Sequence, residues 1–352
     1  MIEIDGSYGE GGGQILRSSL SLAIILDKPI KIYNIRYNRS KPGLRPQHFS
    51  TIKILRDLFN AEVQGLEIGS DTIKFYPKFQ RYKFTTKDNF KIDVGTAGSI
   101  PLILQSIIPS ISITKNYIQI LLSGGTDVRG SPTIDYIKYV LRDAYELLGI
   151  RFNIDIIKRG YYPKGGGLVK VEILPCKNII PIDLVNKKPI EPKIHSVYSN
   201  LPNQISERQI SSVLSMLEKK GIKCSNYTTS YETAISPGTS ILVYAKSNFG
   251  PFIGGDSIGE IRKTAEEVGR EAGEKFLESY MKNITIDHYL ADMLVMPISL
   301  SNGRSRYIIG KITSHFLTNL EIVSKIVGLE FKIKKTLENN YMIDTTSSRN
   351  NN

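Results

Sequence analysis

Two of the four histidines stand where an imidazole could act as a nucleophile. His48 and His315 are each followed by phenylalanine and then by apolar residues at intervals of three and four. This spacing predicts amphipathic helices, so both rings are expected at helix N-termini, where the helix dipole favours the neutral imidazole. A neutral imidazole can attack an electrophilic phosphorus atom. A lone histidine is more often structural, so both interpretations remain open at this point.

The two other histidines suit different roles. His195 falls in a predicted strand, where a structural role is expected. His288 precedes Asp292 by four residues, so their side chains share one face of a predicted helix. Two residues without a third ligand do not make a metal site, and none is expected there.

Residues 6–14 form a glycine-rich segment between a predicted strand and a helix that starts near Gly13. Glycine lets backbone N–H groups approach an anion closely, and a helix N-terminus favours negative charge. The segment matches neither the P-loop nor the dinucleotide-binding spacing, so a tight turn and a phosphate site both remain open. Glu10 favours the phosphate site, because a carboxylate beside phosphates requires a divalent cation between them.

Two further segments carry unusual residues. A loop that leads into the helix of His48 contains four cations, Arg36, Arg39, Lys41 and Arg45. These charges repel one another unless an anion lies among them, so phosphate binding is favoured over a solvated basic loop. Residues 159–167 end in three consecutive glycines, which an ordinary hairpin does not need. Spacing alone leaves the function of residues 159–167 undetermined.

The elements that must position these residues form a repeat. Three amphipathic helices are predicted, at residues 47–55, 131–148 and 314–323. A more apolar helix precedes each of them, at residues 13–25, 98–109 and 288–300. Strands separate the helices, for example at residues 30–35, 72–76, 117–122 and 168–173. The pattern predicts an α/β (α+β) fold in which three βαβαββ-type units form one large domain.

The composition changes between the second and third units. Residues 184–277 are predicted to be an inserted smaller α/β domain, with strands at 190–198, 223–231 and 239–246 and helices at 206–220 and 257–281. The large domain then comprises residues 1–183 and 278–340. Residues 341–352 are polar and are predicted to be a disordered tail.

The whole composition limits the class of protein. A formal net charge of +12 favours a polyanionic partner such as nucleic acid or nucleotide phosphates, although a Lys-rich composition can have other causes. No run of eighteen apolar residues is present, so no membrane span is expected. The first residues lack the pattern of a signal peptide, and two distant cysteines are expected as free thiols. These features predict a cytoplasmic protein.

Five motifs, in order along the chain, resemble those of the RNA 3′-terminal phosphate cyclase family. They are residues 5–17, 41–48, 123–127, 159–167 and 289–292, and the resemblance extends from residue 1 to about residue 340. It implies a large domain of three repeated units, similar to the C-terminal domain of a bacterial translation initiation factor, with a smaller inserted domain. It also implies an ATP-dependent enzyme of the ligase class that converts an RNA 3′-phosphate into a 2′,3′-cyclic phosphate.

The resemblance implies a role for particular residues. His315 corresponds to the nucleophile that attacks the α-phosphorus of ATP, forming a covalent histidine–AMP intermediate. AMP then passes to the RNA 3′-phosphate, and the adjacent 2′-hydroxyl displaces it. Glu10 corresponds to the acid that contacts a divalent metal, Mg or Mn. Residues around the phosphates correspond to Arg17, Arg39 and Gln105. The adenine pocket corresponds to Pro132, Tyr136, Tyr289 and Asp292, followed by Met293 where the family has glutamine.

The expected partner is therefore RNA with a 3′-terminal phosphate, and the protein is expected to be a monomer or a homodimer. The main alternative is a non-catalytic relative that acts in ribosomal RNA processing. Such relatives share the glycine motifs but lack the active-site histidine, so His315 favours the enzyme. A carbohydrate-type transferase with a similar architecture is a second alternative, because fold does not determine function.

Overall fold

A computed structural model describes residues 1–78, 89–95, 98–114, 116–185, 190–247, 250–282 and 284–347. In these residues a βαβαββ unit occurs three times, and the four strands of each unit form a sheet with the same order. The first strand pairs in parallel with the second, the second pairs antiparallel with the fourth, and the fourth pairs antiparallel with the third. The predicted fold class and its threefold repeat are confirmed.

The first unit contains β1 (Ile2–Asp5), α1 (Gly13–Leu26), β2 (Ile30–Tyr33), α2 (Pro46–Leu58), β3 (Glu62–Gln64) and β4 (Ile73–Tyr76). The second contains β5 (Asn89–Asp93), α3 (Ile100–Ile113), β6 (Ile118–Gly124), a helix in three parts, β7 (Phe152–Lys158) and β8 (Gly167–Ile173). That helix comprises α4 (Ile134–Tyr136), a π-helical turn (Ile137–Leu141) and α5 (Arg142–Leu147).

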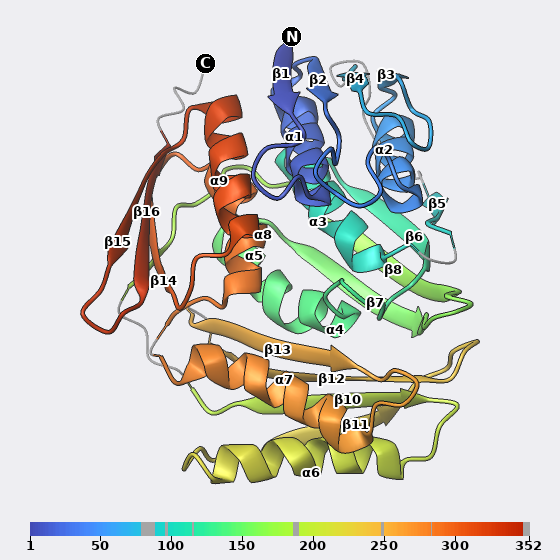
Figure 1. Cartoon of the computed structure of the whole chain (residues 1–352), viewed down its shortest axis with the longest axis vertical. Coiled ribbons are helices and arrows are strands. Elements are labelled where there is room, and N and C mark those ends of the chain that lie inside the picture. The colour runs from blue at the N-terminus through green and yellow to red at the C-terminus, as the bar shows by residue number, and fades with distance from the viewer. Residues whose placement is uncertain are drawn as a thin grey trace.

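The third unit is interrupted after its first strand. It contains β9 (Asp183–Leu184) and then, after the interruption, α8 (His288–Ile298), β14 (Gly303–Ile309), α9 (Ser314–Val327), β15 (Glu330–Lys335) and β16 (Tyr341–Ser347). Helices α1, α3, α8 and α9 lie toward the middle of the molecule, and the three sheets lie around them (Figure 1). One large hydrophobic core includes residues of all three units.

The interruption has a sheet and a core of its own. It contains β10 (Lys193–Ser199), α6 (Gln204–Glu218), β11 (Asn226–Tyr231), β12 (Gly238–Lys246), β13 (Phe252–Ile258) and α7 (Ala265–Tyr280), with strand order β11-β10-β12-β13. Its apolar side chains, from Ile194 to Ile284, form a second cluster. Figure 1 shows α6 and α7 on the face of this sheet that is turned away from the three units. We propose that these elements are the inserted domain, and the name is used for them below.

Two predictions about these elements were wrong. Residues 252–258 form β13, so the helix predicted from residue 257 begins only at Ala265. Thr264 and Glu267 form a capping box at this start, because each side chain accepts a hydrogen bond from the backbone N–H of the other residue. The prediction of a disordered polar tail was also wrong, because residues 341–347 form β16, whose Ile343 is fully buried. The fourth strand completes the third sheet, and residues 348–352 of the predicted tail lie outside the described residues.

Within the part of the chain that the structure describes, no helix combines the length and apolar character that crossing a bilayer requires.

Candidate active site

Helix α9 presents His315 in its first turn. Thr313 is the N-cap, and its Oγ1 accepts a hydrogen bond of 3.0 Å from the backbone N–H of Phe316. The side chain of His315 is 48% exposed, and its Nε2 lies 2.7 Å from Oε2 of Glu10. The ring is therefore turned toward the glycine-rich loop and away from the core, as a nucleophile requires.

The glycine-rich loop, residues 6–14, contacts both α9 and the basic loop, which is the loop that contains Arg36, Arg39, Lys41 and Arg45. The backbone N–H of Glu10 donates to Oγ1 of Thr318 at 3.4 Å, one turn beyond His315. Arg39 Nη2 donates to the same Glu10 oxygen that contacts His315, at 3.3 Å. One carboxylate thus joins the histidine to an arginine, although the three residues lie in widely separated parts of the sequence.

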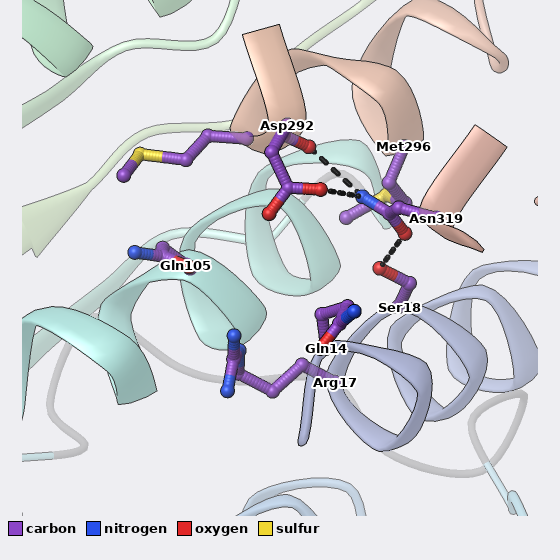
Figure 2. Close-up of a pocket in the computed structure, with 8 residues that line it drawn as sticks. Gln14, Arg17, Ser18, Gln105, Asp292, Met296 and Asn319 are labelled. Carbon is purple, nitrogen blue, oxygen red and sulfur yellow. Dashed lines mark hydrogen bonds between the residues drawn. The ribbon is translucent and has the colours of Figure 1, made fainter. Parts of the chain in front are cut away.

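Next to these residues lies a small cavity between α1, α3, α8 and α9. Figure 2 shows its lining, which consists of Gln14, Arg17, Ser18, Gln105, Asp292, Met293, Met296 and Asn319. Asn319 follows His315 by four residues, so both lie on one face of α9. Its amide donates to the Asp292 carboxylate at 3.1 Å and accepts from the Ser18 hydroxyl at 2.6 Å. These bonds connect α1, α8 and α9 at the wall of the cavity.

The cavity wall carries polar atoms that lack a partner among the described residues. The guanidinium of Arg17 makes no hydrogen bond with the other lining residues drawn in Figure 2. The Gln14 side chain is only 2% exposed, and neither polar atom of its amide has a partner among the described residues. Burial raises the pKa of the Asp292 carboxyl, although Arg17, His315 and the Asn319 amide oppose that rise. Buried donors and acceptors of this kind normally pair, so the wall is suited to a polar ligand.

His48 lies beside the glycine-rich loop, and Arg36, Arg17 and Arg45 lie close enough to affect its charge. A Cβ atom at Gly13 would lie 2.7 Å from Nε2 of His48 and 3.3 Å from Nη1 of Arg17, so a larger residue there would displace the His48 ring. Arg36 has a φ of 57°, in the left-handed region that non-glycine residues seldom adopt. Its Nε is buried without a partner among the described residues. Strained, unpaired cations of this kind are typical of functional sites.

His48 makes a pH-dependent contribution to stability. Burial, with additional effects from Arg36, Arg17 and Arg45, lowers its pKa to about 4 from an ordinary value of 6.5. Below pH 6.5 the unfolded chain binds a proton that the folded protein excludes, so this stability is complete above pH 6.5 and is lost as the pH falls toward 4. Between pH 6.5 and pH 4, we expect His48→Gln to reduce the slope of the free energy of unfolding against pH by up to about 1.4 kcal/mol per pH unit.

The measurement is urea unfolding at several pH values across that window. Nδ1 of His48 accepts the backbone N–H of Arg45, and glutamine can also serve as this capping acceptor. His288→Asn is the control, because burial lowers the pKa of His288 to about 4 as well. A reduced slope for the His288 variant together with an unchanged slope for His48→Gln would contradict a buried neutral His48.

The residues predicted for the adenine pocket lie on α8 and at the start of α4. Tyr289 is 43% exposed and lies on α8, the helix that carries Asp292 and Met293. Pro132 precedes Thr133, the N-cap of α4. Tyr136 is only 1% exposed, and its hydroxyl donates to the Asp287 carboxylate at 2.8 Å. Asp287 is the N-cap of α8, so we expect Tyr136 to position α8 rather than to contact a nucleotide.

The structure therefore brings seven of the ten predicted residues together in two groups, and Pro132, Tyr136 and Tyr289 lie outside both. His315, Glu10 and Arg39 are joined by direct contacts, while Arg17, Gln105, Asp292 and Met293 line the cavity. Sequence reasoning missed Asn319, Gln14, Ser18 and Met296. Asn319 could have been found from its position four residues after His315 on the same helix. Gln14 and Ser18 are likewise four residues apart on one face of α1, but no pattern indicated which ligand this face would meet.

The residues of the site fit a divalent cation that takes most of its ligands from phosphate oxygens and water. In the described residues no group of three or more His, Cys, Asp or Glu side chains could form a metal cage. Glu10 offers a single carboxylate whose Oε2 alone makes the contacts with Arg39 and His315. This suits Mg or Mn, which take their other ligands from phosphate oxygens and water. Such an ion would neutralise negative charge on bound phosphates.

The fold and the site together define an α/β protein with an exposed histidine beside a glycine-rich loop. A family model described as RNA 3′-terminal phosphate cyclase matches residues 8–333. Proteins with that name are 42% identical in Saccharolobus solfataricus, over 95% of this chain and 96% of the relative, and 39% identical in Pyrobaculum aerophilum, over 94% of each. The relative from Pyrococcus furiosus is 38% identical over 95% of each chain. The chain belongs to the RNA 3′-terminal phosphate cyclase family and is an enzyme of that family.

Proposed function

We propose that the enzyme uses ATP to convert an RNA 3′-terminal phosphate into a 2′,3′-cyclic phosphate through a covalent adenylate on His315. The observation that carries this proposal is the contact of 2.7 Å between Nε2 of His315 and Oε2 of Glu10. It places an exposed imidazole beside Arg39 and next to a cavity lined by Arg17, Gln105 and Asp292. The alternative of a non-catalytic relative lacks support, because such a protein does not need this histidine.

In the first step, Nε2 of His315 attacks the α-phosphorus of ATP. A nitrogen–phosphorus bond forms, the bond between the α-phosphorus and the bridging oxygen breaks, and pyrophosphate leaves. Nε2 attacks with its lone pair while the ring proton stays on Nδ1, so a proton on Nε2 must first pass to Glu10, whose carboxylate lies within hydrogen-bond distance. Arg39 and Arg17 supply positive charge where charge develops on the phosphate oxygens.

In the second and third steps, AMP passes to the RNA and is then displaced. An oxygen of the RNA 3′-phosphate attacks the adenylate phosphorus, which releases His315. The neighbouring 2′-hydroxyl then attacks the 3′-phosphorus and loses its proton to water. The bond from this phosphorus to the oxygen shared with AMP breaks, and AMP leaves as the ring closes. Arg36 and His48 support this proposal, because two phosphate groups that approach one another need cations and hydrogen-bond donors around them. The last step requires a 2′-hydroxyl and therefore RNA.

Incubation of the purified protein with ATP labelled at the α-phosphate, in the presence of Mg or Mn, tests the proposal. We expect the label to remain on the protein after denaturation and to transfer to an RNA with a 3′-phosphate. ATP labelled at the γ-phosphate should leave the protein unlabelled, because pyrophosphate is released. Absence of covalent label with both metals would refute the adenylate on His315.

Arg39→Ala is expected to raise the ATP concentration needed for half-maximal labelling by about tenfold or more, because the variant loses a charged donor beside Glu10. The measurement is the rate of labelling over a range of ATP concentrations. Arg56→Ala is a matched control, since the side chains of Arg39 and Arg56 are both 38% exposed and both pair with one carboxylate. An equal ATP requirement for the two variants would exclude Arg39 from the phosphate site.

A further inference from the structure

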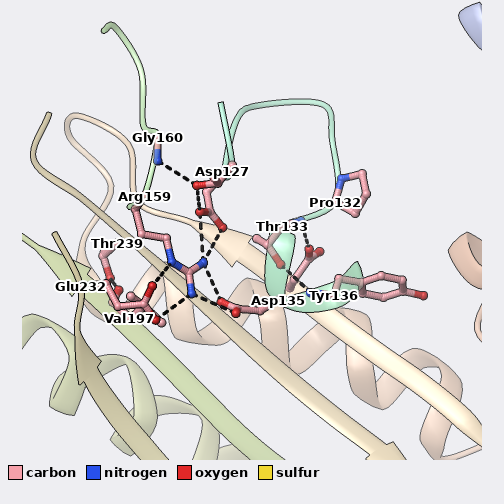
Figure 3. A network of polar contacts seen from close by, with 12 residues as sticks. Asp127, Pro132, Thr133, Asp135, Tyr136, Arg159, Gly160, Val197, Glu232 and Thr239 are labelled. Atoms are coloured by element: carbon pink, nitrogen blue, oxygen red, sulfur yellow. Dashed lines mark hydrogen bonds and ion pairs between the residues drawn. The ribbon is translucent and has the colours of Figure 1, made fainter. Parts of the chain in front are cut away.

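The motif at residues 159–167, which ends in three consecutive glycines, is not explained by the chemistry above. It begins with Arg159, whose side chain is fully buried in a network of three carboxylates (Figure 3). Its guanidinium contacts Asp127 at 3.2 Å, Asp135 at 2.9 Å and Glu232 at 2.7 Å. Asp127 and Asp135 belong to the second unit, whereas Glu232 belongs to the inserted domain. One arginine therefore links the two parts of the protein.

The backbone of the motif strengthens this link. The N–H of Arg159 donates to the carbonyl oxygen of Thr233 at 2.8 Å, and the N–H of Gly160 donates to Oγ1 of Thr126 at 2.9 Å. The ring of Tyr161 lies against Gly238, where a Cβ atom would lie 2.1 Å from the ring. The motif thus contacts the loop after β6 on one side and the inserted domain on the other.

Arg159 also holds the segment from Pro132 to Tyr136. Asp135 is in the first turn of α4, two residues after the N-cap Thr133, so its ion pair with Arg159 fixes the start of this helix. The inserted domain holds the same segment from another direction. Asp256 of β13 accepts a hydrogen bond of 2.7 Å from the backbone N–H of Thr133. Two carboxylates of the inserted domain therefore act on the segment, Asp256 directly and Glu232 through Arg159.

The same segment is connected to the nucleotide side of α8. Tyr136 donates to Asp287, which also accepts a hydrogen bond of 2.9 Å from the backbone N–H of Gly254 in β13. Asp287 caps α8, the helix that carries Tyr289 and Asp292. A shift of the inserted domain would thus move Pro132 and the start of α8 together.

We propose that Arg159 is a positioning residue, which uses the inserted domain to fix Pro132 and the N-terminus of α8 at the adenine side of the nucleotide site. This inference rests on the proposed function, because it assumes that ATP binds between these elements. A planar guanidinium is required, since it must contact three carboxylates from different directions at once. The inserted domain is then a part of the nucleotide site rather than a separate accessory.

Arg159→Lys tests this role, because lysine keeps the charge and loses the planar fork. We expect the KM for ATP in self-adenylation to rise by about tenfold or more, while kcat changes by less than about twofold, because binding geometry changes and the nucleophile does not. Glu232→Gln keeps an acceptor but removes the charge from the inserted domain, and we expect a smaller rise of about threefold. The side chain of Glu232 is 26% exposed, so this variant tests the role even if Arg159→Lys does not fold.

Two controls separate positioning from stability. Arg304→Lys makes the same chemical change in a bidentate pair with Asp344, in the sheet of the third unit. Val213→Ala removes buried volume from α6 and destabilises the inserted domain without a contact to the network. Thermal unfolding is recorded for all variants. Neither control should raise the KM for ATP, even where its Tm falls as far as that of Arg159→Lys.

The proposal is overturned if Arg159→Lys and Glu232→Gln both leave the KM for ATP unchanged. It is equally overturned if Val213→Ala raises the KM as much as Arg159→Lys at the same loss of Tm. Failure of the proposed function would look different, because the wild-type protein would then take up no label. In that case the dissociation constant of ATP, measured by calorimetry, replaces KM. The proposal is then overturned by the same two results, stated for the dissociation constant instead of KM.

Discussion

The replacement of His315 by alanine is expected to abolish the attachment of AMP to the protein, with a loss of at least about 10³-fold in rate. In the proposed mechanism this imidazole is the nucleophile, because its Nε2 supplies the electron pair of the new bond to phosphorus. Alanine has no group that can replace it. The side chain is 48% exposed and its polar contact is with Glu10, so stability should change by less than about 1 kcal/mol. Labelling with α-labelled ATP and urea unfolding measure the two effects.

The chemical nature of the linkage makes this prediction specific. A phosphorus–nitrogen bond is cleaved by acid and resists alkali, so the label on the wild-type protein should be lost in acid alone. ATP binding to His315→Ala, measured by calorimetry, should remain close to that of the wild type, because Arg17, Arg39 and Gln105 are unchanged. Label of the same acid sensitivity on the variant would place the nucleophile elsewhere, and His48 beside the glycine-rich loop would be the next residue to replace.

Glu10→Gln is expected to lower the rate of adenylation by about 10²-fold. The carboxylate contacts both the proposed nucleophile and Arg39, and it is the residue suited to hold a divalent cation. Glutamine keeps the size of the side chain but loses the charge. The loss should therefore appear together with a higher concentration of Mg required for half-maximal rate. Adenylation rates over a range of Mg concentrations measure both quantities.

Glu3→Gln is the matched control for this variant. Glu3 lies in β1, seven residues before Glu10, and its ion pair of 3.3 Å with Lys31 is exposed. We expect its rate and Mg requirement to equal those of the wild type. If Glu10→Gln behaves in the same way, the carboxylate has neither of the roles proposed for it.

The repeat was predictable because buried helices and strands carry strong periodic patterns. Helices beginning near residues 13 and 314 were recognised from apolar spacing, and the structure has them at Gly13–Leu26 and Ser314–Val327. The tail was misread because its composition is polar. Thr345 and Ser347 are nevertheless buried in β16, where small hydroxyl side chains fit a sheet face. The first and second units each end in a fourth strand, β4 and β8, so the repeat itself could have predicted a strand at residues 341–347.

The site was predictable only where a motif could be compared with a family. The 2.7 Å contact between His315 and Glu10 depends on how the first and third units pack, which no local pattern specifies. The role of Arg159 shows the same limit. Its glycine-rich motif was visible in the sequence, but its three carboxylate partners lie 32, 24 and 73 residues away and meet only in the folded protein.

The pairing between the first and third units has a consequence for biosynthesis. The bonds from Glu10 to Thr318 and from Ser18 to Asn319 span 308 and 301 residues, so they close only after residues 318 and 319 have left the ribosome. Contacts of such long range are slow to form, because a large loop must close before they give any stabilisation. A nascent chain can complete its first two sheets while it is still being translated. It acquires catalytic capacity only after helix α9 has been synthesised.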